Sequence, residues 1–126
     1  MRETIGLSDR ADMAAARETV REMGTKIGLA REELRTVLTI VSELCLYAFE
    51  TSRQSLIRFN EISRPGHSGI CIMIRLRQGE SGGAVRPTDS SALSLAGLKK
   101  LADEFEMSVR DGETAIHVIK WRSAPL

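Results

Sequence analysis

The sequence predicts a single two-layer α/β domain, with a mixed or antiparallel sheet that carries its helices on one face. Apolar residues recur at helical spacing through most of the first 50 residues, and they alternate in residues 55–77. An Asp-Gly pair inside residues 106–121 marks a hairpin. Strands gathered on one side of a few helices bury one face of each layer. A length of 126 residues suits one domain, residues 1–126, without a repeat or linker.

The first half of the chain is expected to form a short edge strand and two helices. Residues 3–7 (ETIGL) suit the strand, and Ser8 or Asp9 can cap the helix that follows. Gly28 is a suitable end for that helix. Its apolar face comprises Met13, Ala16, Val20, Met23 and Ile27. A second helix is expected over residues 30–50. Its apolar face comprises Leu34, Val37, Leu38, Val41, Leu44, Cys45 and Ala48.

The second half is expected to contain two hairpins, separated by a loop and a helix. Residues 55–62 and 69–77 read as antiparallel strands joined by a turn, SRPGHS. One face of the second strand is apolar through Ile70, Ile72, Ile74 and Leu76. Residues 78–93 are rich in Gly, Ser and Pro and predict a loop, followed by a helix over about 94–104. Residues 106–121 then form the second hairpin.

Composition excludes several classes of function. The net charge is +1, so no strong field favours nucleic acid or an anionic membrane. No apolar run is long enough for a membrane span, and the N-terminus lacks the apolar core of a signal peptide. Cys45 and Cys71 lie in apolar patterns without metal-ligand spacing, which predicts reduced, buried thiols. We therefore expect a cytoplasmic protein that binds no metal.

Four segments resemble the small serine kinases of bacterial stress signalling. They are DMAAARETVREMGTKIGL (12–29), TVLTIVSEL (36–44), AGLKKLADEFEMSV (96–109) and GETAIHVIKW (112–121). The chain is similar over nearly its whole length to the RsbT and RsbW types of switch and anti-sigma kinase, and most similar to the RsbT-like branch. These kinases belong to the histidine-kinase-like ATPase (GHKL) superfamily.

The resemblance implies the Bergerat fold, an α/β sandwich that holds ATP and magnesium between its helices and a mobile lid. It also implies a substrate serine in a small STAS-domain protein. A freed switch kinase of this family can in addition bind and activate a phosphatase. Fold alone does not establish function, so each of the three family motifs has to be traced residue by residue.

The first family motif is a helical Glu followed four residues later by Asn. The Glu acts as general base and the Asn holds magnesium. Here Glu43 matches the base, but Tyr47 stands at the Asn position, and the chain's single Asn, Asn60, lies on a predicted strand. A phenol is a poor ligand for a hard cation, and the metal neutralises much of the phosphate charge in phosphoryl transfer. The resemblance therefore implies a damaged catalytic site, with Glu43 the one retained candidate residue.

The second family motif is Asp-x-Gly-x-Gly, in which the Asp receives the adenine amino group. Its Asp position falls on Arg77, its first Gly on Gly79 and its second on Ser81. A guanidinium at the Asp position presents hydrogen-bond donors to the adenine amino group, which is itself a donor. A lost charged hydrogen bond costs roughly 1.5–3 kcal/mol.

The third family motif is the lid, whose glycines fall on Ser90, Ala92 and Ser94.

Two further expectations concern residues around these motifs. Gly97 keeps the family's packing glycine, and Ser94 is suited to cap the third helix. Arg75 and Arg77 should project from the other side of their strand. If that side is the former pocket, these arginines fill it or pair with Glu43. Glu43 otherwise reads as an ordinary helix glutamate.

The sequence therefore favours a pseudokinase that works by binding proteins and needs no cofactor, neither ATP nor magnesium. The expected partners are a STAS-domain antagonist or scaffold and a phosphatase or sigma-regulatory protein. The oligomeric state is open, with a dimer among the options. One alternative is an active or weakly active serine kinase that phosphorylates a STAS-domain protein through Glu43. Another is a module that binds a different small ligand in the remodelled cleft.

Overall fold

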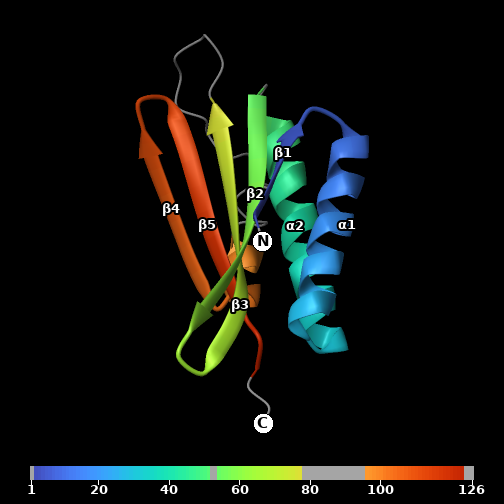
Figure 1. Cartoon of the computed structure of the whole chain (residues 1–126). Helices are drawn as coiled ribbons and strands as arrows, with labels where there is room; N and C mark the ends of the chain where they lie inside the picture. The colour runs from blue at the N-terminus through green and yellow to red at the C-terminus, as the bar shows by residue number, and fades with distance from the viewer. Residues whose placement is uncertain (1, 52–53, 78–95, 124–126) are drawn as a thin grey trace.

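The computed structural model describes residues 2–51, 54–77 and 96–123, which form a two-layer α/β arrangement (Figure 1). Its elements are β1 (Arg2–Leu7), α1 (Arg10–Ile27), α2 (Arg31–Thr51), β2 (Gln54–Arg64), β3 (His67–Arg77), β4 (Glu104–Arg110) and β5 (Glu113–Trp121). The strands form one sheet in the order β1-β2-β3-β5-β4, and every pair of neighbours is antiparallel. The predicted α/β class with an antiparallel sheet is confirmed, and β1 is the expected edge strand.

Local sequence signals set both ends of α1. The Asp9 carboxylate accepts hydrogen bonds from the backbone N–H groups of Ala11 and Asp12. The Asp12 carboxylate accepts in return from Asp9 N–H at 3.2 Å, which completes a capping box. At the other end Gly28 adopts a left-handed conformation with φ 84°. Both predicted caps of this helix are confirmed.

Tight turns close both hairpins. Arg64 pairs with His67 across the first, which leaves only Pro65 and Gly66 in the turn. Arg110 pairs with Glu113 across the second, where Asp111 and Gly112 have φ values of 51° and 75°. Positive φ at both central positions is the pattern of a type I′ turn, which Asp-Gly favours. The hairpin predicted from this dipeptide is confirmed.

The third helix ends earlier than predicted, and the second hairpin begins earlier. Residues 96–101 are helical, whereas β4 already begins at Glu104. The reason is that Asp103, directly before β4, already hydrogen-bonds to β5, since its N–H donates to Ile119 O at 3.0 Å. Its carboxylate also accepts from Trp121 N–H at 2.7 Å. The predicted loop over 78–93 and the cap at Ser94 lie outside the described residues.

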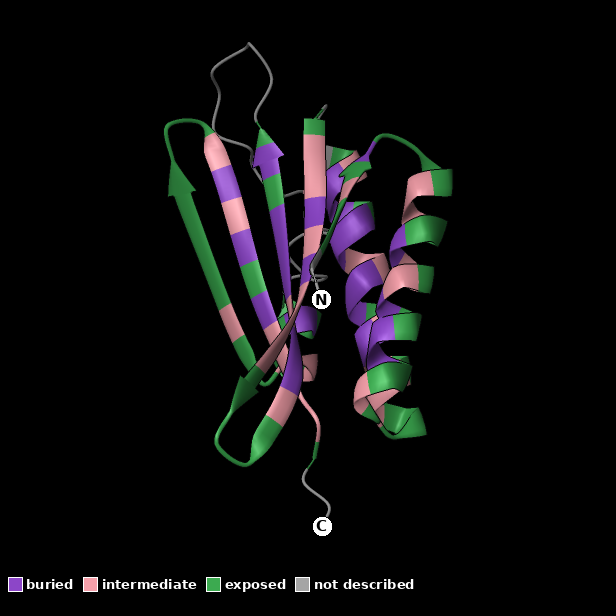
Figure 2. Ribbon diagram, viewed as in Figure 1, coloured by how far each residue is buried: buried purple, intermediate pink, exposed green. Residues whose placement is uncertain are grey.

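The core lies between the helices and one face of the sheet. Figure 2 shows buried residues on the sides of α1 and α2 that face the strands. The helices contribute Val20, Val37, Ile40, Val41 and Leu44, and the sheet contributes Ile57, Phe59, Ile72, Ile74, Ile116 and Val118, all at 0% exposure. Leu98 of the third helix is also fully buried. Among the described helices, none is long and apolar enough to cross a membrane.

The opposite face of the sheet carries the alternate residues of the same strands, and we call it the open face. None of the described helices packs against it (Figure 1). On β3, Arg75 and Arg77 are exposed on this face, whereas Ile74 and Leu76 point into the core. Met73 also lies on the open face but is only 5% exposed. This face is therefore charged and only partly apolar.

Candidate functional site

Glu43 and Tyr47, the two positions of the first family motif, lie on the same side of α2, one helical turn apart. Glu43 is half-buried, whereas Tyr47 is 3% exposed and belongs to the hydrophobic core. Burial raises the pKa of the Tyr47 hydroxyl, which therefore stays neutral at physiological pH. The place of a magnesium-holding side chain is thus taken by a buried neutral phenol.

Arg75 and Arg77 lie on the open face, away from Glu43 and Tyr47. The Arg75 Nε is 3.5 Å from a carboxylate oxygen of Glu113 on β5, so its ionic partner is Glu113. Arg75 and Arg77 project from the other side of their strand as predicted, but the pairing of Arg75 with Glu43, considered for the case in which that side is the former pocket, is not found, because the sheet separates the two side chains. Arg77 lines a hollow of about 310 Å³ on the open face. The remaining residues around this hollow are Gln54, Ser55, Leu56, Arg75 and Glu113.

Most of the predicted nucleotide positions lie outside the described residues. These are Gly79, Ser81, Ser90, Ala92 and Ser94, whose roles stay predictions. Gly97 is described and exposed, and a Cβ built on it meets no atom of the described chain within 4 Å. The close packing expected at Gly97 is therefore not seen in this part of the structure.

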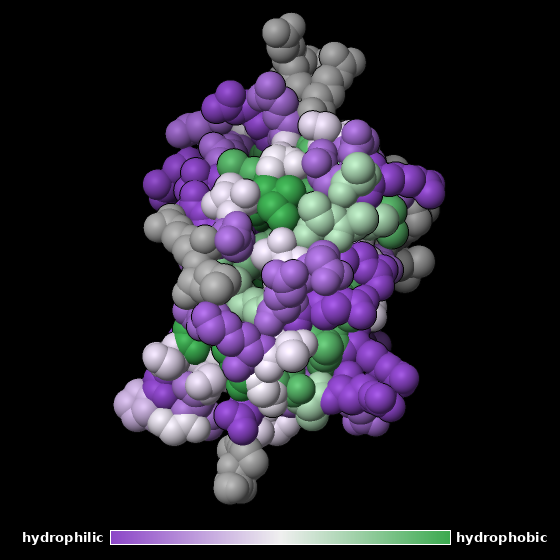
Figure 3. Space-filling view, turned by 45° about the vertical axis from the view of Figure 1, so that its right-hand side comes forward, coloured by the Kyte–Doolittle hydropathy of each residue, from purple (hydrophilic) through white to green (hydrophobic). Residues whose placement is uncertain are grey.

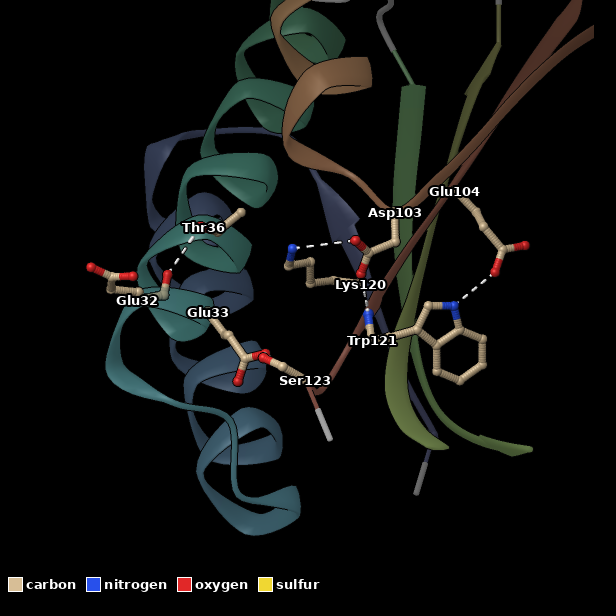
Figure 4. A network of polar contacts seen from close by, with 8 residues as sticks. All are labelled: Glu32, Glu33, Thr36, Asp103, Glu104, Lys120, Trp121 and Ser123. Atoms are coloured by element: carbon tan, nitrogen blue, oxygen red, sulfur yellow. Dashed lines mark hydrogen bonds and ion pairs between the residues drawn. The ribbon is translucent and has the colours of Figure 1, made fainter. Parts of the chain in front are cut away.

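A polar network at the opposite end of the molecule joins α2 to the end of β5 (Figure 4). The Glu33 carboxylate accepts a hydrogen bond from Ala30 N–H at 2.7 Å and others from the backbone N–H and hydroxyl of Ser123. Burial by itself raises the pKa of Glu33, but these hydrogen bonds, together with the positive charge of Lys120, outweigh it and hold the pKa below its ordinary value.

Trp121 is the centre of the second part of this network. Its indole Nε1–H donates to the Glu104 carboxylate at 2.8 Å, and the Arg64 guanidinium lies 4.8 Å from its ring centre. The Lys120 Nζ lies 3.5 Å from the Asp103 carboxylate, and only 18% of the Lys120 side chain is exposed. These contacts join β2, β4 and β5 to one another at this end of the sheet.

The network surrounds a cleft of about 490 Å³. The cleft is lined by Glu33, Arg64, His67, Asp103, Lys120, Trp121, Arg122 and Ser123. The Glu33 and Asp103 carboxylates each accept from backbone N–H groups, so they act here as structural acceptors. Sequence reasoning missed this cleft because Glu33 and Ser123 are 90 residues apart. Only the folded register brings them together, and no local motif marks them.

Figure 3 turns the side that carries α1 and α2 toward the viewer. It shows hydrophilic side chains mainly toward the edges of this view, with apolar patches between them. Among the described residues, no group of three or more His, Cys, Asp or Glu side chains has the spacing to hold a metal ion. His67 lies 6.0 Å from the Trp121 ring, centre to centre, in a tilted arrangement.

Comparisons with known proteins support the fold. The chain is similar to a chain in the crystal structure of the SiaB–SiaC complex from Pseudomonas aeruginosa, with a TM-score of 0.72 and 10% identity. The match covers 95% of this chain and 88% of the other. No family model and no curated protein matches the sequence. At this identity the likeness shows a shared fold and no more.

Proposed function

We propose that this chain is a degenerate relative of the stress-signalling switch kinases, which acts by binding proteins and does not bind ATP productively. The observation that carries the proposal is Tyr47, which stands 3% exposed at the position where the family needs a magnesium ligand. Magnesium prefers carboxylate, carbonyl or water oxygens in near-octahedral geometry. A neutral phenol packed in the core supplies no such ligand.

The position of Arg77 supports the same conclusion. It stands where the family has the Asp that receives adenine, and it occupies the open face instead of the helix-covered face. An adenine held between the sheet and the helices would find no acceptor from this position. Two of the three motifs are thus altered at described residues, and the proposal predicts weak nucleotide binding or none.

A role in protein binding is supported by the fold and by the intact core. The solved structure reported above, which shares the fold, is a complex of two proteins. The chain retains a fully buried core between its two layers, as expected of a domain maintained for its surface. We propose a STAS-domain antagonist or scaffold as the principal partner, and a phosphatase or sigma-regulatory protein as a second one.

The decisive measurement is a calorimetric and thermal-shift titration with Mg-ATP. We expect no saturable heat and no shift in Tm, because neither the metal nor the adenine has its partner. A ligand at a hundred times its Kd would stabilise the folded state by about 2.7 kcal/mol, which thermal shift detects easily. Such a stabilisation would contradict the proposal. Binding of a STAS-domain protein should be equally strong with and without nucleotide.

The alternative of an active kinase is favoured by the retention of half-buried Glu43 alone. It predicts transfer of phosphate from ATP to a serine of the STAS-domain protein, and loss of that transfer in Glu43→Gln. Glu32→Gln, an exposed position on the same helix, is the matched control and should retain the transfer. Phosphotransfer with this pattern would replace the binding-only proposal.

A further inference from the structure

The open face carries a cluster of arginines that the proposed function does not use. The register of β2 to β5 places five arginines and three glutamates on this face. They are Arg58, Arg64, Arg75, Arg77 and Arg110, and Glu104, Glu106 and Glu113. The helix-covered face of the same four strands is built mainly from aliphatic residues and Phe59. Positive charge is thus concentrated on one side of the sheet.

These arginines differ in whether a nearby carboxylate neutralises their positive charge. Arg64 lies 3.4 Å from Glu104, which also accepts from the Trp121 indole, so this pair is part of a network. Among the described residues, Arg75 has Glu113 as its one ionic partner, at 3.5 Å, and the two side chains are 54% and 40% exposed. Arg110 is exposed, and its guanidinium forms no ion pair among the described residues. Unmatched positive charge therefore lies toward the β4–β5 turn.

Two adjoining hollows lie at this end of the open face. The hollow of about 310 Å³ that Arg77 lines and a second of about 230 Å³ share Arg75 and Glu113. The second is lined in addition by Ser108, Arg110, Asp111 and Ala115. Leu56 contributes apolar surface to the first hollow and Ala115 to the second. Together they form a groove across β2, β3, β5 and β4, which we call the arginine groove.

We propose that the arginine groove docks an acidic segment of a partner protein. A guanidinium presents a planar fork of donors that fits a carboxylate through two parallel hydrogen bonds. The exposed Arg75–Glu113 pair is weak, so an incoming carboxylate can replace Glu113 at little cost. Leu56 and Ala115 provide apolar contacts for the side chains between the acidic residues. This inference rests on the proposed binding role and names the surface that performs it.

The charge distribution favours a protein segment over a nucleic acid. Glu106, Glu113 and Asp111 are interspersed with the arginines, and the net charge of the chain is only +1. A polyphosphate backbone is attracted by continuous positive charge and would be repelled at each acidic residue. Discrete carboxylates on a peptide can instead be placed opposite individual arginines.

The test uses the full chain and a defined probe, a short fluorescein-labelled peptide in which Glu alternates with Ala. Fluorescence anisotropy should show saturable binding that weakens with added salt. Exposed ion pairs are individually weak, but a charge reversal turns attraction into repulsion. The double variant Arg75→Glu, Arg110→Glu should therefore weaken peptide binding by about tenfold or more. The matched control is Arg35→Glu, an exposed arginine on α2, which should leave binding unchanged.

Three outcomes would overturn the docking site. The first is equal binding of a peptide in which Gln replaces Glu, and the second is equal weakening by Arg35→Glu. The third is tighter binding of an RNA oligonucleotide than of the acidic peptide. Amide shifts in a ¹⁵N spectrum provide an independent check, and peptide-induced shifts on α1 and α2 in place of β3, β4 and β5 would also refute it.

The same variants separate this inference from the proposed function. If a STAS-domain protein binds the doubly reversed variant as tightly as the unaltered chain, the docking site is wrong while the binding role stands. If the acidic peptide binds and the STAS-domain protein does not, the partner class proposed above is wrong while the arginine groove stands. Far-ultraviolet circular dichroism confirms that each variant is folded.

Discussion

The two faces of the sheet are made by the same strands but have opposite chemistry. On β3, Ile70, Ile72 and Ile74 are completely buried against the helices, while Arg75 and Arg77, on the other side, are exposed. The first set lies against the helical layer, whereas the second set is free of the described helices. The contrast indicates that stability comes chiefly from the covered face, and that the open face is available for recognition.

The largest expected effect separates two adjacent residues of β2. Ile57 is 0% exposed on the covered face, and Leu56 is half-buried on the open face. Ile57→Ala should lower the free energy of unfolding by about 2–5 kcal/mol, since it leaves a cavity in the core. Leu56→Ala should cost about 1 kcal/mol or less, because less apolar area leaves water there. Urea denaturation with an unchanged m-value measures both losses.

Equal losses in these two variants would break the comparison. They would mean that the open face is packed as tightly as the core in solution, for example by a second protein molecule. Repeating the denaturation at several protein concentrations tests this directly, because association makes stability depend on concentration. We expect no such dependence for either variant.

A smaller effect is expected where the open face is locally close-packed. A Cβ at Gly69 would lie 2.7 Å from Lys120 O and 2.8 Å from the Trp121 ring. Gly69→Ala should therefore destabilise the chain by about 1–3 kcal/mol through overpacking. Gly6→Ala is the matched control on β1, where a Cβ meets nothing of the described chain within 4 Å. Thermal denaturation that shows equal shifts for the two variants would contradict the close approach of Trp121.

The smallest effect concerns the contact between the helical layer and the end of β5. The pKa of Glu33 is held below its ordinary value of 4.5, so its carboxylate stabilises the fold above that pH. This contribution is lost as the pH falls below 4.5 and through the lowered pKa of the folded state. Glu33→Gln should thus reduce stability at neutral pH and lose its effect in acid. A difference from the unaltered chain that stays constant with pH would exclude this role.

Much of the fold could be predicted because its signals are local. Helical and alternating periodicities located the two long helices and the strands, and Asp9, Gly28 and the Asp111–Gly112 turn marked their ends. The end of the third helix was misplaced because it depends on Asp103 contacting Trp121, 18 residues away. A periodicity within a few residues carries no information about such a contact.

Only the local part of the candidate site could be predicted from the sequence. The spacing of Glu43 and Tyr47 fixes them on one side of a helix, and the structure places both there. The partner of Arg75 was not predictable, because it depends on the pairing register of β3 with β5. Likewise, the arginine groove exists only when two hairpins that are distant in sequence, β2–β3 and β4–β5, lie side by side. Sequence shows which residues share an element, and the register decides which of them meet.

The two cysteines differ in burial, so one of them can be labelled selectively to detect binding at the open face. Cys45 is fully buried in α2, and burial, aided by the negative charge of Asp12, raises its pKa to about 12. Cys71 is half-buried on β3, where burial and Glu104 raise the pKa of its thiol. A maleimide dye at mildly alkaline pH should therefore attach to Cys71 and spare Cys45. At roughly 3.3 Å per residue, Cys71 lies about 13 Å along β3 from Arg75, close enough for the dye to sense an occupied groove.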